Sequence, residues 1–249
     1  MNLQDAVAVV TGGTGGLGRR ICHAVARQGV QVAVCYDQRQ EEAETVARGL
    51  RGFGGRAIPV GVDVTRPESV QGLVDRVVRE FGRIDILVND AAYNKWIPFP
   101  QLQDLQLEDW TKILRVNLTG PFACIRAVAP LMRRQGQGRI VNVSSMAGLS
   151  PTGSSIAYAV SKAALIHLTR CMAVALAPDV LVNCVAPGFM EGTRMSQNLS
   201  PEYRQKARQS ALLQRGVDKD DVAEMVVEFC RTDSITGQTL VMDAGRVFH

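Results

Sequence analysis

The sequence predicts an α/β fold, in which a doubly wound parallel sheet of about seven strands carries helices on both faces. Short β-branched runs alternate with helical segments along most of the 249 residues, as they do in parallel sheets. The strand-like runs lack the polar alternation of half-exposed strands, which indicates that both faces of the sheet are buried. No linker, repeat or low-complexity segment interrupts the pattern, so residues 1–249 are expected to form one domain.

Four strands are expected in the first half of the chain, at residues 6–10, 30–35, 57–62 and 84–88. Each precedes a segment with helical periodicity, and these segments span residues 17–28, 39–50, 67–81 and 107–134. Gly29 and Pro67 support these limits, because glycine commonly follows the last helical residue and proline is favoured at the first. Pro121 and Pro130 are expected to bend or break the longest segment.

The second half continues the pattern and then loses it. Further strands are expected at residues 139–143, 180–185 and 239–242, with helices that end near residues 178 and 230. Between them, residues 188–217 contain glycine, serine and charged side chains around one short helix at 201–210. We interpret residues 188–215 as a lid over a substrate, with Gly188 and Gly192 as hinges.

The composition excludes several classes of function. A hydrophobic content of 46% and a dispersed net charge of +4 are those of an ordinary globular protein, and they favour neither a nucleic-acid partner nor a membrane. The six cysteines and three histidines show no metal-ligand spacing. The first strand begins too early to leave room for a signal peptide. We therefore expect a cytoplasmic protein without a metal.

Glycines cluster directly after the first strand, where residues 11–18 read TGGTGGLG. Glycine permits positive φ and a close backbone approach, while the start of the next helix offers free N–H groups to a pyrophosphate. A glycine cluster between a first strand and its helix predicts a dinucleotide site rather than a linker. The expected cofactor contacts in this turn are Gly12, Thr14, Gly15, Gly16, Leu17 and Gly18.

Tyr158 and Lys162 lie four residues apart on a predicted helix, so the phenol and the ammonium face the same space. A free tyrosine has a pKa of about 10. A nearby ammonium lowers that pKa and makes the tyrosine a usable proton donor or acceptor. Such a pair also arises by chance on many helices, so it carries little weight alone.

The glycine spacing TGxxxGxG at Gly12, Gly16 and Gly18, followed by YxxxK at residues 158–162, resembles the short-chain dehydrogenase/reductase family, and in particular its 3-oxoacyl-[acyl-carrier-protein] reductase-like branch. The resemblance covers nearly the whole chain. It implies a Rossmann-type fold, an NAD(P)-dependent oxidoreductase that moves a hydride between nicotinamide and a carbonyl or secondary alcohol, and a homotetramer or homodimer. A catalytically silent sensor or scaffold of the same fold is the alternative, but it predicts damage to the catalytic residues.

The resemblance also assigns roles. Tyr158 is the general acid/base, and Ser145, 13 residues before it, holds the substrate oxygen; Ser144 is the neighbouring alternative. Lys162 lowers the pKa of Tyr158 and binds the nicotinamide ribose. Asn117 matches the catalytic asparagine, whose backbone holds a water; otherwise it is an amide inside a helix. No metal is needed, because the cofactor carries the hydride chemistry.

Further cofactor contacts implied by the resemblance are Asp63, Val64, Asn89, Ala91, Pro187, Gly188 and Thr193. Alternatively, Asp63 serves only to stabilise a local turn. Asp90 replaces an asparagine of the family pattern, which leaves its role open. Thr193 is the best match for the residue that meets the carboxamide, although Glu191 and Gly192 alter the spacing before it.

The choice of nicotinamide depends on the residues after the second strand. An acidic residue there binds the ribose hydroxyls of NAD, whereas arginine or lysine binds the phosphate of NADP. Tyr36 occupies the usual acidic position and Asp37 follows it, while Arg39 lies two residues further on. Gly15 replaces a phosphate-binding basic residue of the family. We expect NAD, with NADP as the alternative.

The substrate is expected to be a small molecule with an apolar body. Trp96 and Phe189 are candidate substrate contacts, with core packing or a subunit contact as the alternative. An apolar pocket suits a ketone, a 3-oxoacyl thioester or a hydroxylated ring. Arg126, Arg133 and Arg134 could meet an acyl carrier protein, although a solvated helix face is the simpler interpretation.

Overall fold

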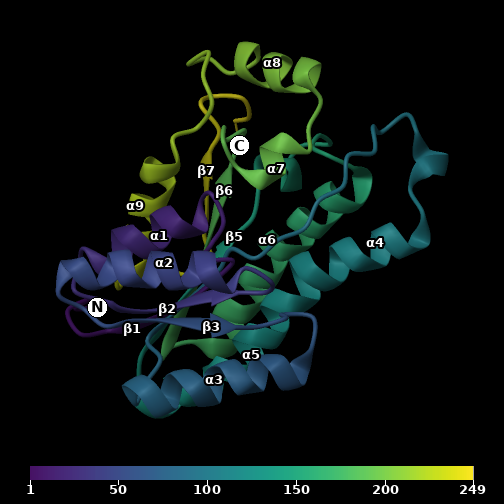
Figure 1. Cartoon of the computed structure of the whole chain (residues 1–249). Helices are drawn as coiled ribbons and strands as arrows, with labels where there is room; N and C mark the ends of the chain where they lie inside the picture. The colour runs from purple at the N-terminus through teal and green to yellow at the C-terminus, as the bar shows by residue number, and fades with distance from the viewer. Residues whose placement is uncertain (249) are drawn as a thin grey trace.

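The computed structural model describes residues 1–248 and contains a seven-stranded sheet in which every neighbouring pair is parallel. The strand order is β3-β2-β1-β4-β5-β6-β7 (Figure 1). The strands are β1 (Val7–Thr11), β2 (Gln31–Tyr36), β3 (Ala57–Gly61), β4 (Ile86–Asn89), β5 (Gly138–Val143), β6 (Val180–Pro187) and β7 (Thr239–Met242). The predicted doubly wound parallel sheet is thereby confirmed.

Helices cover both faces of this sheet, as the alternation of strands and helices predicts. The helices are α1 (Gly18–Ala26), α2 (Gln40–Leu50), α3 (Pro67–Phe81), α4 (Leu107–Leu114), α5 (Gly120–Gln135), α6 (Ile156–Leu176), α7 (Arg194–Gln197), α8 (Pro201–Gln209) and α9 (Lys219–Arg231). In Figure 1, α1, α2 and α9 lie on one face, and α3, α5 and α6 lie on the other.

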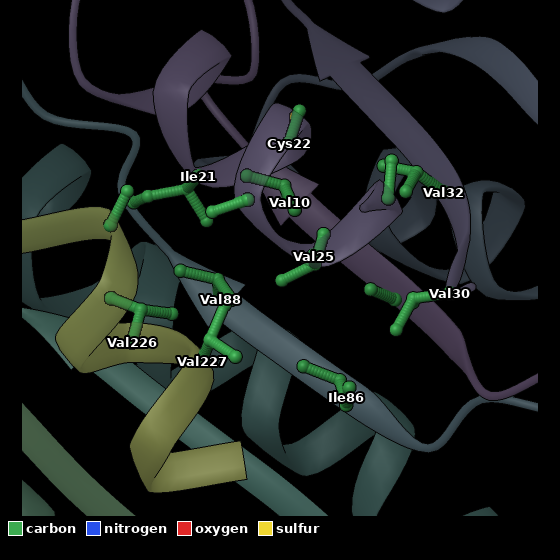
Figure 2. Packing of buried hydrophobic residues seen from close by; sticks show 14 of the residues in the cluster. Val10, Ile21, Cys22, Val25, Val30, Val32, Ile86, Val88, Val226 and Val227 are labelled. Carbon is green, nitrogen blue, oxygen red and sulfur yellow. The ribbon is translucent and has the colours of Figure 1, made fainter. Parts of the chain in front are cut away.

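The strands are buried on both faces because alternate side chains enter two different cores. In β1, Ala8 and Val10 belong to the core beneath α1, α2 and α9, whereas Val7 and Val9 belong to the core beneath α3 and α5. Figure 2 shows the first core, where Val10 and Val88 of the sheet lie near Ile21 of α1 and Val226 of α9. This two-sided burial explains why the strand sequences show no polar alternation.

The long helical region predicted at residues 107–134 is divided, but not by its prolines. A π-helical turn (η3, Arg115–Thr119) separates α4 from α5. Pro121 lies in the first turn of α5, directly after the π-helical turn, and Pro130 lies inside α5 without ending it. Neither proline breaks the helix at its own position.

Helix α6 is, by length and composition alone, also long and apolar enough to cross a membrane. In the structure it packs against β6, α4 and η3, and its buried residues include Leu165 and Ile166. It thus occupies the place of a core helix.

Two glycines allow α1 to approach the sheet closely. A Cβ atom on Gly18, the first residue of α1, would lie 2.2 Å from the carbonyl oxygen of Gly12. Gly12 itself has a φ of +68°, and a Cβ there would lie 2.9 Å from the amide nitrogen of Ala91. The nearest atom at both positions belongs to the backbone, so a side chain there could not be accommodated by moving a flexible neighbour alone.

We predict that Gly18→Ala destabilises the fold by about 1–3 kcal/mol, because the new methyl group must move either the turn or the helix. Gly72, in the middle of α3, is the matched control, since a Cβ there has no neighbour within 4 Å. Gly72→Ala should stabilise the fold by about 0.5–1 kcal/mol. Urea unfolding of both variants measures the difference; equal effects would contradict the steric argument.

Candidate active site

A cleft of about 560 Å³ opens at the carboxyl edge of the sheet, where β1, β4, β5 and β6 end. Most of the residues predicted from the sequence line it: Gly12, Thr14, Gly15, Gly16, Leu17, Tyr36, Asp37, Asp63, Val64, Ala91, Ser145, Tyr158, Lys162, Pro187, Gly188, Phe189 and Thr193. Clefts at this edge are the usual ligand sites of parallel sheets. The fold thus brings together residues that lie up to 181 positions apart (193 − 12).

Four of the predicted residues do not line the cleft. Gly18 supports the glycine-rich turn from behind, as described above. Asn89 is buried and donates from its side chain to Asn142 Oδ1 at 2.9 Å, which ties β4 to β5. Trp96 packs edge-to-face against Tyr203, with ring centroids 5.2 Å apart, and Asn117 is fully buried.

The glycine-rich turn fits a dinucleotide pyrophosphate. Within residues 1–248, the backbone N–H groups of Gly16 and Leu17 find no acceptor, and both residues line the cleft at the start of α1. A Cβ on Gly16 would lie 3.1 Å from the carbonyl oxygen of Gly192 across the cleft. Free amides at a helix start and a narrow gap bounded by glycine are the features that a pyrophosphate needs.

The two serines after β5 have different partners. The Ser144 hydroxyl donates to the backbone carbonyl of Lys162 at 2.8 Å, so it is used to hold α6. The Ser145 hydroxyl accepts from the amide of Ala147 at 3.2 Å and makes a long bond to the carbonyl of Pro187 at 3.4 Å. Both serines line the cleft, but Ser145 is the more exposed of the two and its hydroxyl makes the longer bonds.

Tyr158 lies on the first turn of α6, beside Ser145. Burial raises the pKa of the Tyr158 phenol to about 12, and its hydrogen bonding with Ser145 opposes that rise. The sequence led us to expect a lowered pKa through Lys162, but the Lys162 ammonium lies 5.8 Å from the centre of the Tyr158 ring and donates to the carbonyl of Val143 at 2.8 Å. In this arrangement burial is the largest influence on the pKa of the phenol.

Lys162 is almost completely buried behind Tyr158. Burial lowers the pKa of its ammonium group to about 8, and the carboxylate of Asp90 acts against that change. Desolvation disfavours the charged form of a lysine, while an opposite charge favours it. The charge of Lys162 near neutral pH thus depends on Asp90.

Asp90, whose role the sequence left open, connects the glycine-rich turn with Lys162. Its backbone amide donates to the Thr11 hydroxyl at 3.1 Å, and its carboxylate accepts from the amide of Gly18. Burial raises the pKa of the Asp90 carboxyl to about 7, and attraction to Lys162 lowers it. Each group therefore favours the charged form of the other.

The side chain of Asn117 organises the wall of the cleft. Its Oδ1 accepts from the amide of Tyr93 at 2.7 Å, and its Nδ2 donates to the carbonyl of Tyr93 at 2.9 Å and to the Ser161 hydroxyl at 3.1 Å. Asn117 thereby joins the 93–99 loop to α6. It lies in the π-helical turn η3, a feature common at functional sites.

The segment interpreted as a lid contacts the opposite wall in two places. The phenol of Tyr203 on α8 bonds to the Thr152 hydroxyl at 3.0 Å and accepts from the amide of Gly153 at 3.1 Å. The side chain of Asn198 donates to Asn94 Oδ1 at 2.9 Å, and that of Asn94 donates to the carbonyl of Met195 at 3.2 Å. Figure 1 shows α7 and α8 above the same end of the sheet.

Sequence reasoning missed Tyr203 and Asn94, which both line the cleft. No local pattern marks them, because their partners lie far away in the sequence. The hydroxyl of Thr193, by contrast, was predicted but is engaged in capping α7, where it accepts from the amide of Ser196 at 3.1 Å. Among residues 1–248, no group of His, Cys, Asp and Glu side chains is placed to hold a metal ion.

Comparison with known proteins agrees with this geometry. Residues 6–204 match the family described as short chain dehydrogenase. The chain is 37% identical to a 3-oxoacyl-[acyl-carrier-protein] reductase of Synechocystis sp. over 250 residues, covering 98% of each protein. The NAD⁺-bound structure of a xylitol dehydrogenase is similar, with a TM-score of 0.90, 32% identity and coverage of 98% of this chain and 100% of that one.

An NADPH-dependent 3-quinuclidinone reductase from Rhodotorula rubra is also similar, with a TM-score of 0.89, 28% identity, and coverage of 98% of this chain and 92% of that one. Of these two solved structures, one is titled for NAD⁺ and the other for NADPH. The fold is thus compatible with either nucleotide.

We predict that Asp90→Asn lowers the pKa of Lys162 further below about 8, because burial remains while the attractive carboxylate is lost. NMR titration of ¹³C-labelled lysine side chains measures this pKa directly. Asp104→Asn, an exposed carboxylate in the turn Leu102–Asp104, is the control and should leave it unchanged. An unchanged or higher Lys162 pKa in Asp90→Asn would show that the two groups are not coupled.

Proposed function

Since the chain belongs to the short-chain dehydrogenase family and is an NAD(P)-dependent oxidoreductase, we propose that Ser145, Tyr158 and Lys162 handle the substrate oxygen and its proton. The observation that carries this proposal is their common position: all three line the cleft that the glycine-rich turn also lines. The sensor alternative predicts loss of at least one of these side chains, and the comparisons do not favour it.

In the proposed reaction, the bound dinucleotide supplies or accepts the hydride. The Ser145 hydroxyl donates a hydrogen bond to the substrate oxygen as negative charge grows on it. Tyr158 gives its phenolic proton to that oxygen during reduction, and removes the proton from the alcohol during oxidation. Lys162 stabilises the phenolate, while Asp90 favours the charged form of Lys162.

We predict that Tyr158→Phe lowers turnover by about 10²–10⁴-fold, the usual contribution of a general acid or base. The ring remains, so the dissociation constant of the dinucleotide should stay within about twofold of wild type. Absorbance of the reduced nicotinamide, followed with a panel of ketones and alcohols, measures turnover, and fluorescence titration measures binding. Near-normal turnover in this variant would exclude Tyr158 as the proton carrier.

We propose NAD as the preferred cofactor. Asp37 is exposed at the end of the cleft that follows β2, where an acidic side chain can accept hydrogen bonds from the adenine ribose. Arg39 lines the same end, but its guanidinium donates to both carboxylate oxygens of Glu42 at 3.0 Å each. The Asp37 carboxylate, which has no ion-pair partner among residues 1–248, would repel a 2′-phosphate. The Arg39 guanidinium is already paired with Glu42 and so is less available to bind one.

Asp37→Ala is expected to raise the ratio of kcat/KM for NADPH to kcat/KM for NADH by roughly tenfold, because the repulsion of the phosphate and the bonds to the ribose hydroxyls are both lost. Asp104→Ala, far from the end of β2 in the sequence, is the control and should leave the ratio unchanged. Wild-type preference for NADPH, or an unchanged ratio in Asp37→Ala, would refute the assignment.

For the substrate we propose a carbonyl compound or alcohol with an apolar body, such as a ketone, a 3-oxoacyl thioester or a hydroxylated ring. The aromatic side chains of Tyr93, Phe189 and Tyr203 line the cleft and support this choice. Trp96 contributes behind Tyr203 rather than at the cleft surface. We further propose that residues 188–215 open to admit the substrate, since their contacts with the opposite wall are few: the hydrogen bonds of Tyr203, Asn198 and Asn94 and the packing of Tyr203 on Trp96.

A homodimer or homotetramer is also proposed, with α5 and α6 in the contact. Phe122 is 40% exposed on α5 and Val174 is 84% exposed on α6, and a shallow groove between these helices is lined by Met172. Exposed apolar surface of this kind favours association. Arg126 and Arg133 line the same groove, so such a contact would compete with the docking of an acyl carrier protein there.

A further inference from the structure

One carboxylate holds two arginines beside the end of the cleft where the adenine ribose is proposed to bind. Glu42, in the first turn of α2, accepts from Arg39 Nη1 at both of its oxygens, each at 3.0 Å. Its Oε2 also accepts from Arg19 Nη2 at 2.8 Å. The three side chains come from α1, the segment after β2 and α2, so the fold alone brings them together.

Arg19 fixes this cluster to the glycine-rich turn. Its Nε and Nη2 donate to the carbonyl of Thr14 at 3.3 and 3.0 Å. Glu42 is thus held from the side of the turn as well as from the side of β2. The position of the Arg39 guanidinium therefore depends on a network of five hydrogen bonds around Glu42 and Arg19.

This network determines which charges the cleft presents at the end of β2. Tyr36, Asp37, Gln38 and Arg39 line the cleft there, and Arg39 is the one cation among these four. Within residues 1–248, the Asp37 carboxylate has neither a hydrogen-bond donor nor an ion-pair partner. The cleft thus offers a free carboxylate to the ribose, while the Arg39 guanidinium is paired with Glu42.

We propose that Glu42 is a selectivity residue for the nicotinamide cofactor, which acts by engaging Arg39 and so withholding it from a 2′-phosphate. Glu42 is a positioning residue, because it does not line the cleft. Arg39 gives one nitrogen, Nη1, to both oxygens of Glu42, and this contact holds the guanidinium at Glu42. A 2′-phosphate needs the same guanidinium, so the two anions compete for it. The proposal rests on the proposed cofactor preference and extends it to a residue outside the cleft.

Glu41 provides the matched control. It lies beside Glu42 in the first turn of α2, carries the same charge and is exposed, but it forms no ion pair among residues 1–248. A general effect of negative charge at the start of α2 would therefore be the same for Glu41→Gln and Glu42→Gln. An effect through Arg39 would appear only in Glu42→Gln.

The test measures the binding of nucleotides to the protein, which requires no substrate. The dissociation constants of NADH, NADPH and adenosine 2′,5′-bisphosphate are determined for wild type, Glu42→Gln, Glu41→Gln and the double variant Glu42→Gln/Arg39→Ala. Glu42→Gln should tighten the binding of NADPH and the bisphosphate by about two- to fivefold, the range that corresponds to one partly exposed ion pair. NADH should change by less than about twofold, because it carries no 2′-phosphate.

Three results would overturn the proposal: equal shifts in Glu42→Gln and Glu41→Gln, no shift in Glu42→Gln, or a gain that survives Arg39→Ala. Tighter binding of NADPH than NADH by wild type would instead refute the NAD preference. The comparison between the two glutamate variants would still decide whether Glu42 acts through Arg39, so the two failures are distinguishable. Thermal unfolding of each variant checks that the exposed substitutions leave the fold intact.

Discussion

Parallel backbone pairing sets Thr11 opposite Asn89, Asn89 opposite Asn142, and Val143 opposite Val185. The residues that follow these pairs therefore emerge at one edge: Gly12, Asp90, Ser144 and Ala186. The Thr11 hydroxyl reinforces this edge, because it accepts from the amides of Asp90 and Ala91 at 3.1 Å and donates to the carbonyl of Val88 at 3.3 Å. A shift of one residue in this register would turn every side chain of the moved strand to the other face and would separate the glycine-rich turn from the proton-transfer residues.

Burial governs the chemistry at this edge. The same desolvation raises the pKa values of Tyr158 and Asp90 and lowers that of Lys162, so all three groups are displaced toward their neutral forms. Attraction between Asp90 and Lys162 counteracts this for the pair. At the other end of the cleft the charged groups Asp37, Arg39 and Glu42 are more exposed, and there the pairing of charges matters more than burial. The electrostatics of the cleft are thus dominated by burial at the proposed proton-transfer end and by charge pairing beside the proposed ribose end.

Much of the fold could be predicted because its signals are local. Buried strands such as residues 6–10, glycine at the ends of helices and the alternation of strand with helix all depend on neighbours along the chain. The TGGTGGLG turn and the four-residue spacing of Tyr158 and Lys162 are equally local signals. Most residues of the turn, and both Tyr158 and Lys162, line the cleft. The proline signal, by contrast, did not locate the interruption of the long helical region. Pro121 and Pro130 signal a break by their chemistry, but the actual interruption is the π-helical turn at Arg115–Thr119, which is stabilised by the contacts of Asn117 with Tyr93 and Ser161.

The sequence by itself therefore determined the order of the elements, the glycine-rich turn and the residues proposed to carry the proton. Only the tertiary structure decided that Ser144 is tied to Lys162 while Ser145 faces the cleft, that Tyr203 and Asn94 form part of its wall, and that Glu42 neutralises Arg39. It also shows that burial is the largest influence on the Tyr158 pKa. The reason is physical: periodicity and backbone preference act over a few residues, whereas desolvation and charge pairing depend on groups that meet only after the chain has folded.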